Sequence, residues 1–260
     1  MKKQILAVMV GLTVILGGCS KQSAQNTESK QSIENIESIL QEVKKETKEL
    51  KSGKATMVNF LKYDKIATSN ALGYDVSGDE KFEPLEYALK GKYMSNVYGE
   101  KKYESYLKDG VYYIKMDDFW YKKKRPTDKS DAYNFKDQSI NMRDDILNLL
   151  DNKDNWDVTK DGDKVTFKLK KNDETKRKVE EEYLKTVNNN GKAVKFSEFD
   201  FTIEYVLNAK TKNIEKIAYE IIGGSDEYSK IISKGSLEEI NKEVNIVLPE
   251  ESENAVDMEI

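Results

Sequence analysis

Alternation of apolar and polar residues with a period of two is the feature that most constrains the fold of this chain. It is clearest in FDFTIEYVLNAKTKNIEKIAYEII (residues 199–222), where two alternating runs flank a turn at 210–212. Successive side chains of a strand point to opposite faces of a sheet, so such a run buries one face and solvates the other. The segment therefore predicts an antiparallel hairpin with one apolar face. That face contains Phe199, Phe201, Ile203, Tyr205, Leu207, Ile217, Tyr219 and Ile221.

Shorter segments repeat this pattern around compact turns. In WDVTKDGDKVTFKLKK (156–171), the residues Val165, Phe167 and Leu169 alternate with polar ones. In YESYLKDGVYYIKMDDFWYKKK (103–124), an Asp-Gly pair separates two alternating runs, which is a strong hairpin signal. The other predicted strands are 57–63, 85–97, 103–107, 111–116, 119–123 and a closing strand at 245–248.

Three segments show a helical period instead. From Ile33 to Leu50, apolar residues recur every three or four positions and include Leu40 and Val43. This predicts an amphipathic helix that ends near Ser52. Apolar residues at helical spacing within 140–150 and within 179–187 predict two more helices, inserted between strands. The expected fold class is α+β, with one antiparallel sheet, a leading helix and two inserted helices.

The N-terminal region contains the only cysteine, in GLTVILGGCSKQ (11–22). An uncharged apolar run follows two lysines and is too short to span a bilayer, which needs about 20 apolar residues. Its end, Leu16-Gly17-Gly18-Cys19, resembles the bacterial lipobox. The resemblance implies cleavage before Cys19 and diacylation of its thiol. We expect a signal peptide at 1–18, a lipidated polar tether at 19–30 and one domain at 31–260; the alternative is a secreted protein with a spare thiol.

Composition excludes several classes of function. The chain has no histidine and one cysteine, which excludes His-based catalysis, disulfides within the chain and Cys-based zinc sites. The net charge is −4, so no basic excess draws the chain to nucleic acid. No carboxylate pair stands out as an acid and a base. We therefore expect no enzymatic activity and no cofactor or metal. Lysine far outnumbers arginine, which is typical of AT-rich genes of low-GC Gram-positive bacteria.

Two clusters of side chains allow more than one interpretation. Tyrosine favours strands in general, so the tyrosines of 98–121 either reflect that preference or form a concave aromatic surface that holds a ligand. The basic run at 122–125 is either a set of solvated lysines at a strand end or a phosphate or head-group site. The aromatic residues concerned are Tyr98, Tyr103, Tyr106, Tyr112, Tyr113, Trp120 and Tyr121.

The order of these segments resembles a known family. A lipobox, a polar tether and a helix precede DGVYYIKMDDFWYKK, and FTIEYVLNAKTKNIEKIAYEI and VNIVLPEE follow. This is similar to uncharacterised Gram-positive lipoproteins with a LolA/LppX-like fold. The resemblance implies a strongly curved antiparallel sheet, a half-barrel, with helices over its concave side. Characterised relatives bind lipoprotein acyl chains or cell-envelope lipids there. The resemblance implies no specific binding residues for this sequence.

These observations lead to one main functional hypothesis and one alternative. The main hypothesis is a lipoprotein on the extracytoplasmic face of the cell membrane that binds an apolar or amphipathic, lipid-like ligand in a half-barrel cavity. The alternative is a surface interaction module with a filled core that recognises a protein or glycan, although the sequence identifies no protein partner. The expected cavity residues are Leu40, Val43, Val165, Phe167, Leu169, Phe199, Phe201, Ile203, Tyr205, Leu207, Ile217, Tyr219 and Ile221.

Overall fold

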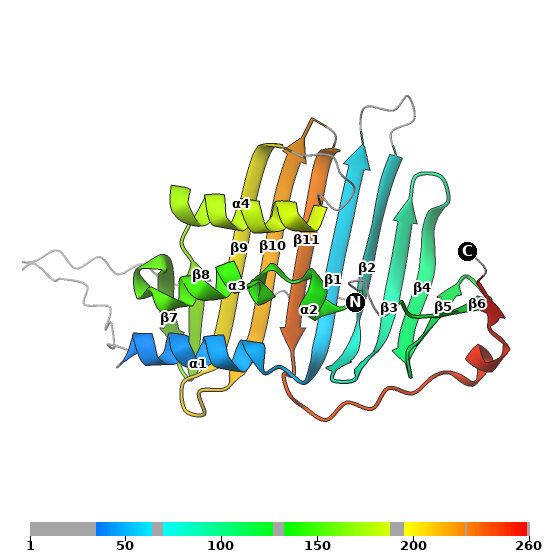
Figure 1. Cartoon of the computed structure of the whole chain (residues 1–260), viewed down its shortest axis with the longest axis horizontal. Coiled ribbons are helices and arrows are strands. Elements are labelled where there is room, and N and C mark those ends of the chain that lie inside the picture. Colours follow the sequence, from blue (N-terminus) through cyan, green and yellow to red (C-terminus); the bar gives the residue numbers. More distant parts are fainter. Residues whose placement is uncertain (1–34, 64–69, 127–132, 188–194, 227, 259–260) are drawn as a thin grey trace, which may run out of the picture. The chain divides into compact units, whose positions relative to one another are not determined.

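The computed structural model describes residues 35–63, 70–126, 133–187, 195–226 and 228–258 (Figure 1). The expected signal peptide, Cys19 and the tether lie outside the described residues, as does the start of the expected domain at 31–34. The description that follows concerns the compact unit that begins at Asn35.

One large sheet dominates this unit and is almost entirely antiparallel. Within the described residues it has 12 strands, in the order β12-β6-β5-β4-β3-β2-β1-β11-β10-β9-β8-β7. Only the short β12 pairs in parallel, with β6. The strands are β1 (Ser52–Tyr63), β2 (Asn70–Phe82), β3 (Leu85–Ser95), β4 (Gly99–Lys108), β5 (Val111–Met116), β6 (Phe119–Lys124), β7 (Trp156–Asp161), β8 (Lys164–Leu169), β9 (Phe196–Asn208), β10 (Ile214–Ser225), β11 (Tyr228–Glu238) and β12 (Val256–Asp257).

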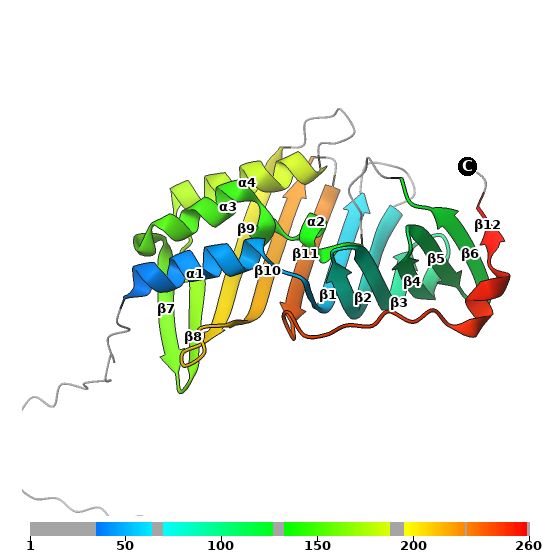
Figure 2. The same cartoon turned by 60° about the horizontal axis from the view of Figure 1, so that its bottom comes forward.

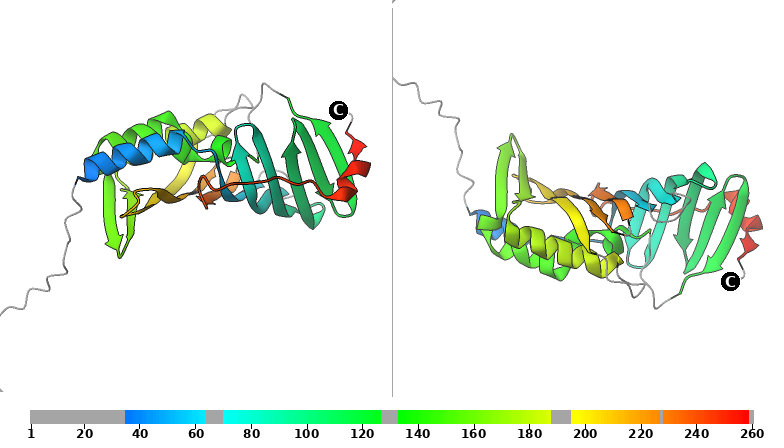
Figure 3. Two further views of the ribbon diagram at one scale, coloured as in Figure 1. Left: turned by 90° about the horizontal axis from the view of Figure 1, so that it is seen from below. Right: turned by 90° about the horizontal axis from the view of Figure 1, so that it is seen from above.

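Helices lie over one end of the sheet, on one of its faces (Figures 2 and 3). The α-helices are α1 (Ile36–Lys48), α2 (Phe135–Gln138), α3 (Asp144–Leu147) and α4 (Asp173–Val187). The 3-10 turns are η1 (Ile140–Met142), η2 (Asn148–Asp151), η3 (Lys153–Asn155) and η5 (Glu250–Asn254). We call the side of the sheet that bears α1 to α4 the helical face, and the other side the back face. The helices cover β7 to β11 and leave β3 to β6 open on the helical face (Figure 2).

Most of the expected elements are confirmed. The leading helix is α1, where the side chain of Asn35 caps Ser38 N at 3.2 Å, and the hairpins β7–β8 and β9–β10 occur as expected. The helix expected at 140–150 is wrong as one element, because extended backbone at Arg143 divides it into η1 and α3. The strand expected at 245–248 is also wrong: residues 242–249 form neither helix nor strand. There the buried Ile246 contributes its carbonyl oxygen as an acceptor for Lys108 Nζ at 2.6 Å.

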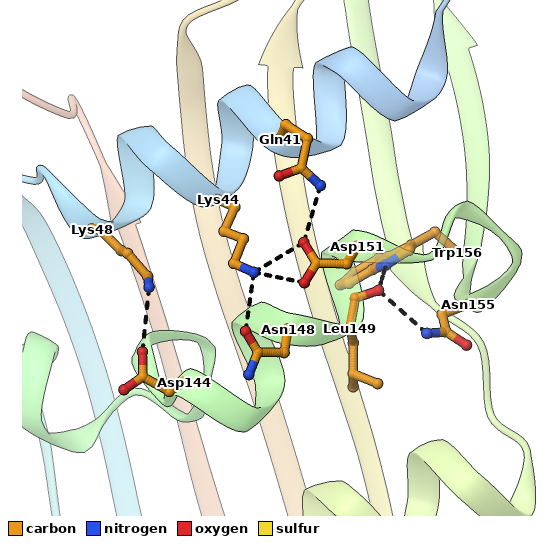
Figure 4. Close-up of polar contacts among 9 residues, drawn as sticks. All are labelled: Gln41, Lys44, Lys48, Asp144, Asn148, Leu149, Asp151, Asn155 and Trp156. Carbon is orange, nitrogen blue, oxygen red and sulfur yellow. Dashed lines mark hydrogen bonds and ion pairs between the residues drawn. The ribbon is translucent and has the colours of Figure 1, made fainter.

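Polar contacts fasten α1 to the segment that contains α3 and η2 (Figure 4). Lys44 Nζ lies 2.8 and 2.9 Å from the two carboxylate oxygens of Asp151 and donates to Asn148 Oδ1 at 3.0 Å. Gln41 Nε2 donates to Asp151 Oδ1 at 3.0 Å. The next segment is fixed by Trp156, whose Nε1 donates to the carbonyl of Leu149 at 2.9 Å. These contacts hold α1 in place over the sheet.

The Lys44–Asp151 pair predicts a pH-dependent contribution to stability. Hydrogen bonds from Lys44 and then Gln41 hold the pKa of Asp151 below its usual range. A lowered pKa in the folded state stabilises the fold above the unfolded pKa, and this is lost as the pH falls through the folded value. Lys44→Met should lower the free energy of unfolding by about 0.5 kcal/mol at neutral pH, the value of an exposed ion pair. Urea unfolding at neutral and acidic pH measures the difference in free energy of unfolding between the unmodified chain and Lys44→Met. This difference should become smaller in acid.

A matched control removes a nearby lysine that makes only a distant contact. Lys45 Nζ lies 4.0 Å from Glu42 Oε1, and Lys45→Met should change the free energy of unfolding less than Lys44→Met does. If the difference in free energy of unfolding between Lys44→Met and the unmodified chain stayed constant down to strongly acidic pH, ionisation of Asp151 would not be its source.

Candidate functional site

The structure gathers the expected cavity residues into one buried layer. In the register of β8, β9 and β10, Phe167 and Ile217 both lie opposite Tyr205, and Tyr219 lies opposite Ile203. All 13 expected residues are at most 8 % exposed, and Leu40 and Val43 of α1 are 0 % exposed. The two hollows described below are lined by other residues. A ligand cavity in this layer stays a prediction, and the observed layer is the buried core beneath the helices.

Two tyrosine hydroxyls within this layer are buried with it. Tyr205 donates its hydroxyl to the carbonyl of Asn141 at 3.1 Å, and Asn141 Nδ2 in turn donates to the carbonyl of Ala218 at 3.2 Å. Burial raises the pKa of Tyr205, and it raises the pKa of Tyr219 to about 12. Both phenols are therefore neutral at physiological pH, and the Tyr205 hydroxyl is a hydrogen-bond donor within the core.

The aromatic residues of β4 to β6 divide between the two faces of the sheet. Alternation along each strand places Tyr103, Tyr112 and Tyr121 on the helical face. Tyr106, Tyr113 and Trp120 lie on the back face, where Tyr106, Trp120 and Ala255 form a buried cluster with Ala88, Tyr113 and Leu248 packed against it. The C-terminal segment thus covers the back-face aromatics, which are structural. The hypothesis of an aromatic surface applies only to the helical face.

On the helical face, side chains of β3 to β6 line a hollow of about 540 Å³ that we call the aromatic groove. It shares its face with the helices because Phe135 of α2 lies against Gly235, and a row of cross-strand neighbours connects Gly235 to the groove. That row is Gly235, Met57, Val76, Gly91, Tyr103 and Met116. The residues that line the groove are Tyr93, Tyr98, Tyr103, Ile114, Met116, Asp117, Phe119, Tyr121, Tyr133 and Met258.

The wall of the groove nearest to the helices is an aromatic stack. Tyr133, just before α2, has its ring centroid 5.2 Å from that of Tyr74 and 5.5 Å from that of Tyr103. Asn59 Nδ2 donates to the hydroxyl of Tyr74, and burial raises the pKa of Tyr74. Offset and tilted ring contacts of this kind add to the stability supplied by area burial. This wall therefore belongs to the fixed part of the fold.

The outer end of the groove is apolar and exposed. Tyr98, in the turn between β3 and β4, is 71 % exposed, and Phe119, the first residue of β6, is 67 % exposed. Met116 and Met258 are 40 % and 36 % exposed. Asp117 is the charged member of the lining, and Lys101 Nζ lies 3.0 Å from its Oδ2. Clustered large apolar side chains with a polar rim are typical of interaction sites.

Sequence reasoning identified part of this groove. Tyr98, Tyr103 and Tyr121 belong to the aromatic cluster that it singled out. Tyr133 and Met258 were missed, since they come from segments far from β3 to β6 in the sequence. No local pattern around either residue marks it as part of a site.

Among the residues that the structure describes, no group of three or more acidic side chains is placed to hold a metal ion. The helices within the described ranges include none that is long and apolar enough to cross a membrane.

Comparison with protein families assigns the chain by sequence. The sequence model of a family of unknown function, DUF6612, matches residues 35–252. This chain belongs to the DUF6612 family. The DUF6612 match includes α1, all strands from β1 to β11 and Tyr133, and it ends before β12 and Met258.

Curated protein sequences and solved structures were also compared with the chain. No curated protein sequence matches the chain. Among solved structures, it is similar to the crystal structure of LprF from Mycobacterium bovis, with 14 % sequence identity and a TM-score of 0.45. The similarity covers 83 % of this chain and 97 % of LprF.

Proposed function

We propose that this DUF6612 protein is an extracytoplasmic lipoprotein, anchored through Cys19, that binds an apolar or amphipathic, lipid-like ligand. The aromatic groove carries this proposal. It is a hollow of about 540 Å³ lined mainly by aromatic, Ile and Met side chains, on the part of the helical face that the helices leave open. The same proposal includes the fold: the sheet is of the half-barrel type found in the LolA/LppX-like fold.

The chemistry of the groove fits an apolar chain with a polar end. Small-molecule sites are commonly about 300–1,000 Å³ and mostly apolar, with a few polar groups that fix orientation. Burial of the exposed parts of Phe119, Met116 and Tyr98 against a ligand would stabilise the complex by about 25 cal/mol per Å² of apolar area. Tyrosine hydroxyls and the Lys101–Asp117 pair at the rim would remain in contact with water or with a head group.

The groove is suited to binding rather than catalysis. Its carboxylate, Asp117, is engaged by Lys101, and the neighbouring buried phenol of Tyr74 has a raised pKa. The Tyr74 phenol therefore stays neutral near neutral pH and does not exchange protons there, as a general acid or base must. We therefore propose a binding protein without enzymatic activity.

A second candidate function is recognition of a protein or glycan. The exposed rings of Tyr98 and Phe119 favour it, since aromatic residues are enriched at protein interfaces. Such a module would need no enclosed cavity, and the fully buried layer beneath the helices is compatible with that. The two candidates differ in whether a lipid-like molecule occupies the groove.

The deciding experiment expresses residues 20–260 without the lipid. Native mass spectrometry of the purified domain should detect a co-purified lipid-like molecule. Met116→Ser combined with Phe119→Ser should weaken binding of a fluorescent fatty-acid probe about tenfold or more, because apolar contact area is lost. The free energy of unfolding should change little, because both side chains are exposed.

The matched variant fills the buried layer instead. Ile203 is 0 % exposed, and Ile203→Trp should lower the free energy of unfolding by about 1–3 kcal/mol through overpacking while probe binding persists. The reverse result, with uptake lost in Ile203→Trp and kept in the groove variant, would move the ligand to the cavity expected beneath the helices. No uptake by the unmodified domain would leave the interaction module as the function.

A further inference from the structure

A second hollow, of about 460 Å³, lies beside β5, β6 and β12 at the end of the sheet opposite the helices. Four consecutive cationic residues, Lys122–Arg125, contribute to its lining, together with Val111 and Tyr113 and the carboxylates of Asp109 and Asp257. We call it the cationic hollow. The cationic hollow and the aromatic groove share no lining residue, so the inference below does not rest on the proposed lipid function.

The register of the strands explains how the lysines converge. Lys124 lies opposite Val111 and Lys122 lies opposite Tyr113, which places these four side chains on the back face. Arg125 N donates to the carbonyl of Gly110 at 2.9 Å, and this bond fixes the end of β6 against the turn between β4 and β5. The hollow therefore has an apolar floor of Val111 and Tyr113, with two ammonium groups above it.

The lining of this hollow contains more cationic residues than carboxylates. Two lysines of nearby strands are paired with carboxylates: Lys90 Nζ lies 3.2 Å from Glu104 Oε2, and Lys101 Nζ lies 3.0 Å from Asp117 Oδ2. In the described part of the chain, no ion pair joins Lys122, Lys123 or Lys124 to a carboxylate, although Asp257 pairs with Lys122 through the backbone of β12. Neighbouring ammonium groups repel each other. A bound anion would attract both groups and so offset that repulsion.

We propose that the cationic hollow binds a phosphate ester. Lysine ammonium groups, such as those of Lys122 and Lys124, bind phosphate as point charges. The volume exceeds that of a bare phosphate, and the floor of Val111 and Tyr113 accommodates a small organic group attached to it. Either a soluble phosphate ester or the head group of a phospholipid provides this chemistry.

The competing explanation is protection of a sheet edge. Lysines on edge strands prevent pairing with other chains. The backbone of β6 is already paired with β12 at Tyr121 and Lys122, so this part of the edge needs little further protection. The opposite edge provides a matched control: Lys160 of β7 and Lys164 of β8 are exposed lysines of an edge hairpin and make no ion pair among the described residues.

The test uses the purified full-length chain in a non-ionic detergent and isothermal titration calorimetry. One arm adds glycerol 3-phosphate, and the other adds micelles doped with phosphatidylglycerol, with phosphatidylcholine micelles for comparison. In at least one arm, the unmodified chain should bind, and Lys122→Gln combined with Lys124→Gln should weaken binding about tenfold or more. The charge-matched pair Lys160→Gln and Lys164→Gln should bind as the unmodified chain does. Binding should weaken with added salt, since exposed charges are screened.

The arms separate the outcomes. Binding of glycerol 3-phosphate identifies a soluble ester as sufficient, and binding confined to phosphatidylglycerol micelles identifies the lipid head group. Absence of binding in both arms overturns the proposal, as does an equal loss in the two double variants. Unchanged binding by the Lys122→Gln and Lys124→Gln double variant would also overturn it. If that variant also aggregated, these lysines would be assigned to edge protection. None of these outcomes depends on whether the aromatic groove takes up a fatty-acid probe.

Discussion

Replacing Cys19 by alanine should leave the chain as an uncut precursor and abolish its labelling by radioactive palmitate. The reason lies in the sequence Leu16-Gly17-Gly18-Cys19, which combines small residues before the cleavage point with the only thiol of the chain. Without that thiol no diacylglyceryl group can be attached. Two acyl chains anchor a protein stably, because each buried CH₂ contributes about 0.8 kcal/mol and one chain alone is marginal.

Gel mobility, palmitate labelling and membrane fractionation measure this effect together. Ser20→Ala is the control, since it alters the neighbouring residue and keeps the thiol, and it should be processed and labelled normally. If the Cys19→Ala chain were still cut and still labelled, the lipobox interpretation would be wrong. A chain that is cut normally in both variants and never labelled would instead be a secreted protein with a spare thiol.

Phe201→Ala should give one of the largest losses of stability in the chain, about 3–5 kcal/mol in the free energy of unfolding. Phe201 is 2 % exposed, its ring centroid lies 6.4 Å from that of Phe199, and Lys171 Nζ lies 6.0 Å from the Phe201 centroid. Truncation removes a buried aromatic ring and leaves a cavity that its neighbours can fill only in part.

Chemical denaturation of the domain without its lipid provides the measurement, with Phe119→Ala as the matched control. Phe119 is the same residue type at 67 % exposure, so its truncation should change the free energy of unfolding by less than about 0.5 kcal/mol. A loss for Phe201→Ala below about 1 kcal/mol would show that this ring borders open space, as in a ligand cavity.

The two proposed sites use opposite faces of the same end of the sheet. Asp257 of β12 lines the cationic hollow, and Met258, the residue after β12, lines the aromatic groove. A one-residue step along a strand reverses the face that a side chain occupies. The same alternation divides Tyr121 from Lys122 on β6, and it allows variants of one site that leave the other unchanged.

The sequence alone determined the local elements of this protein. A period of two predicts β9 and β10 with the face that they bury, because alternation depends only on which residues follow one another. The spacing of Leu40 and Val43 likewise predicts α1 and its buried side, and both residues are 0 % exposed in the structure. Where the local signal was weak, as at Arg143 and around Ile246, the predicted helix and strand were wrong.

Only the tertiary structure decided how distant segments meet. The sequence analysis did not predict β11, yet this strand lies between β1 and β10 and joins the N-terminal and C-terminal parts of the chain into one sheet. At Gly91, an added Cβ would lie 1.9 Å from the backbone oxygen of Asp75, a constraint that arises only when β2 and β3 are in register. Tyr133 and Met258 enter the aromatic groove for the same reason. Periodicity records the environment of a residue along its own strand, whereas a site depends on register and packing between strands that are distant in the chain.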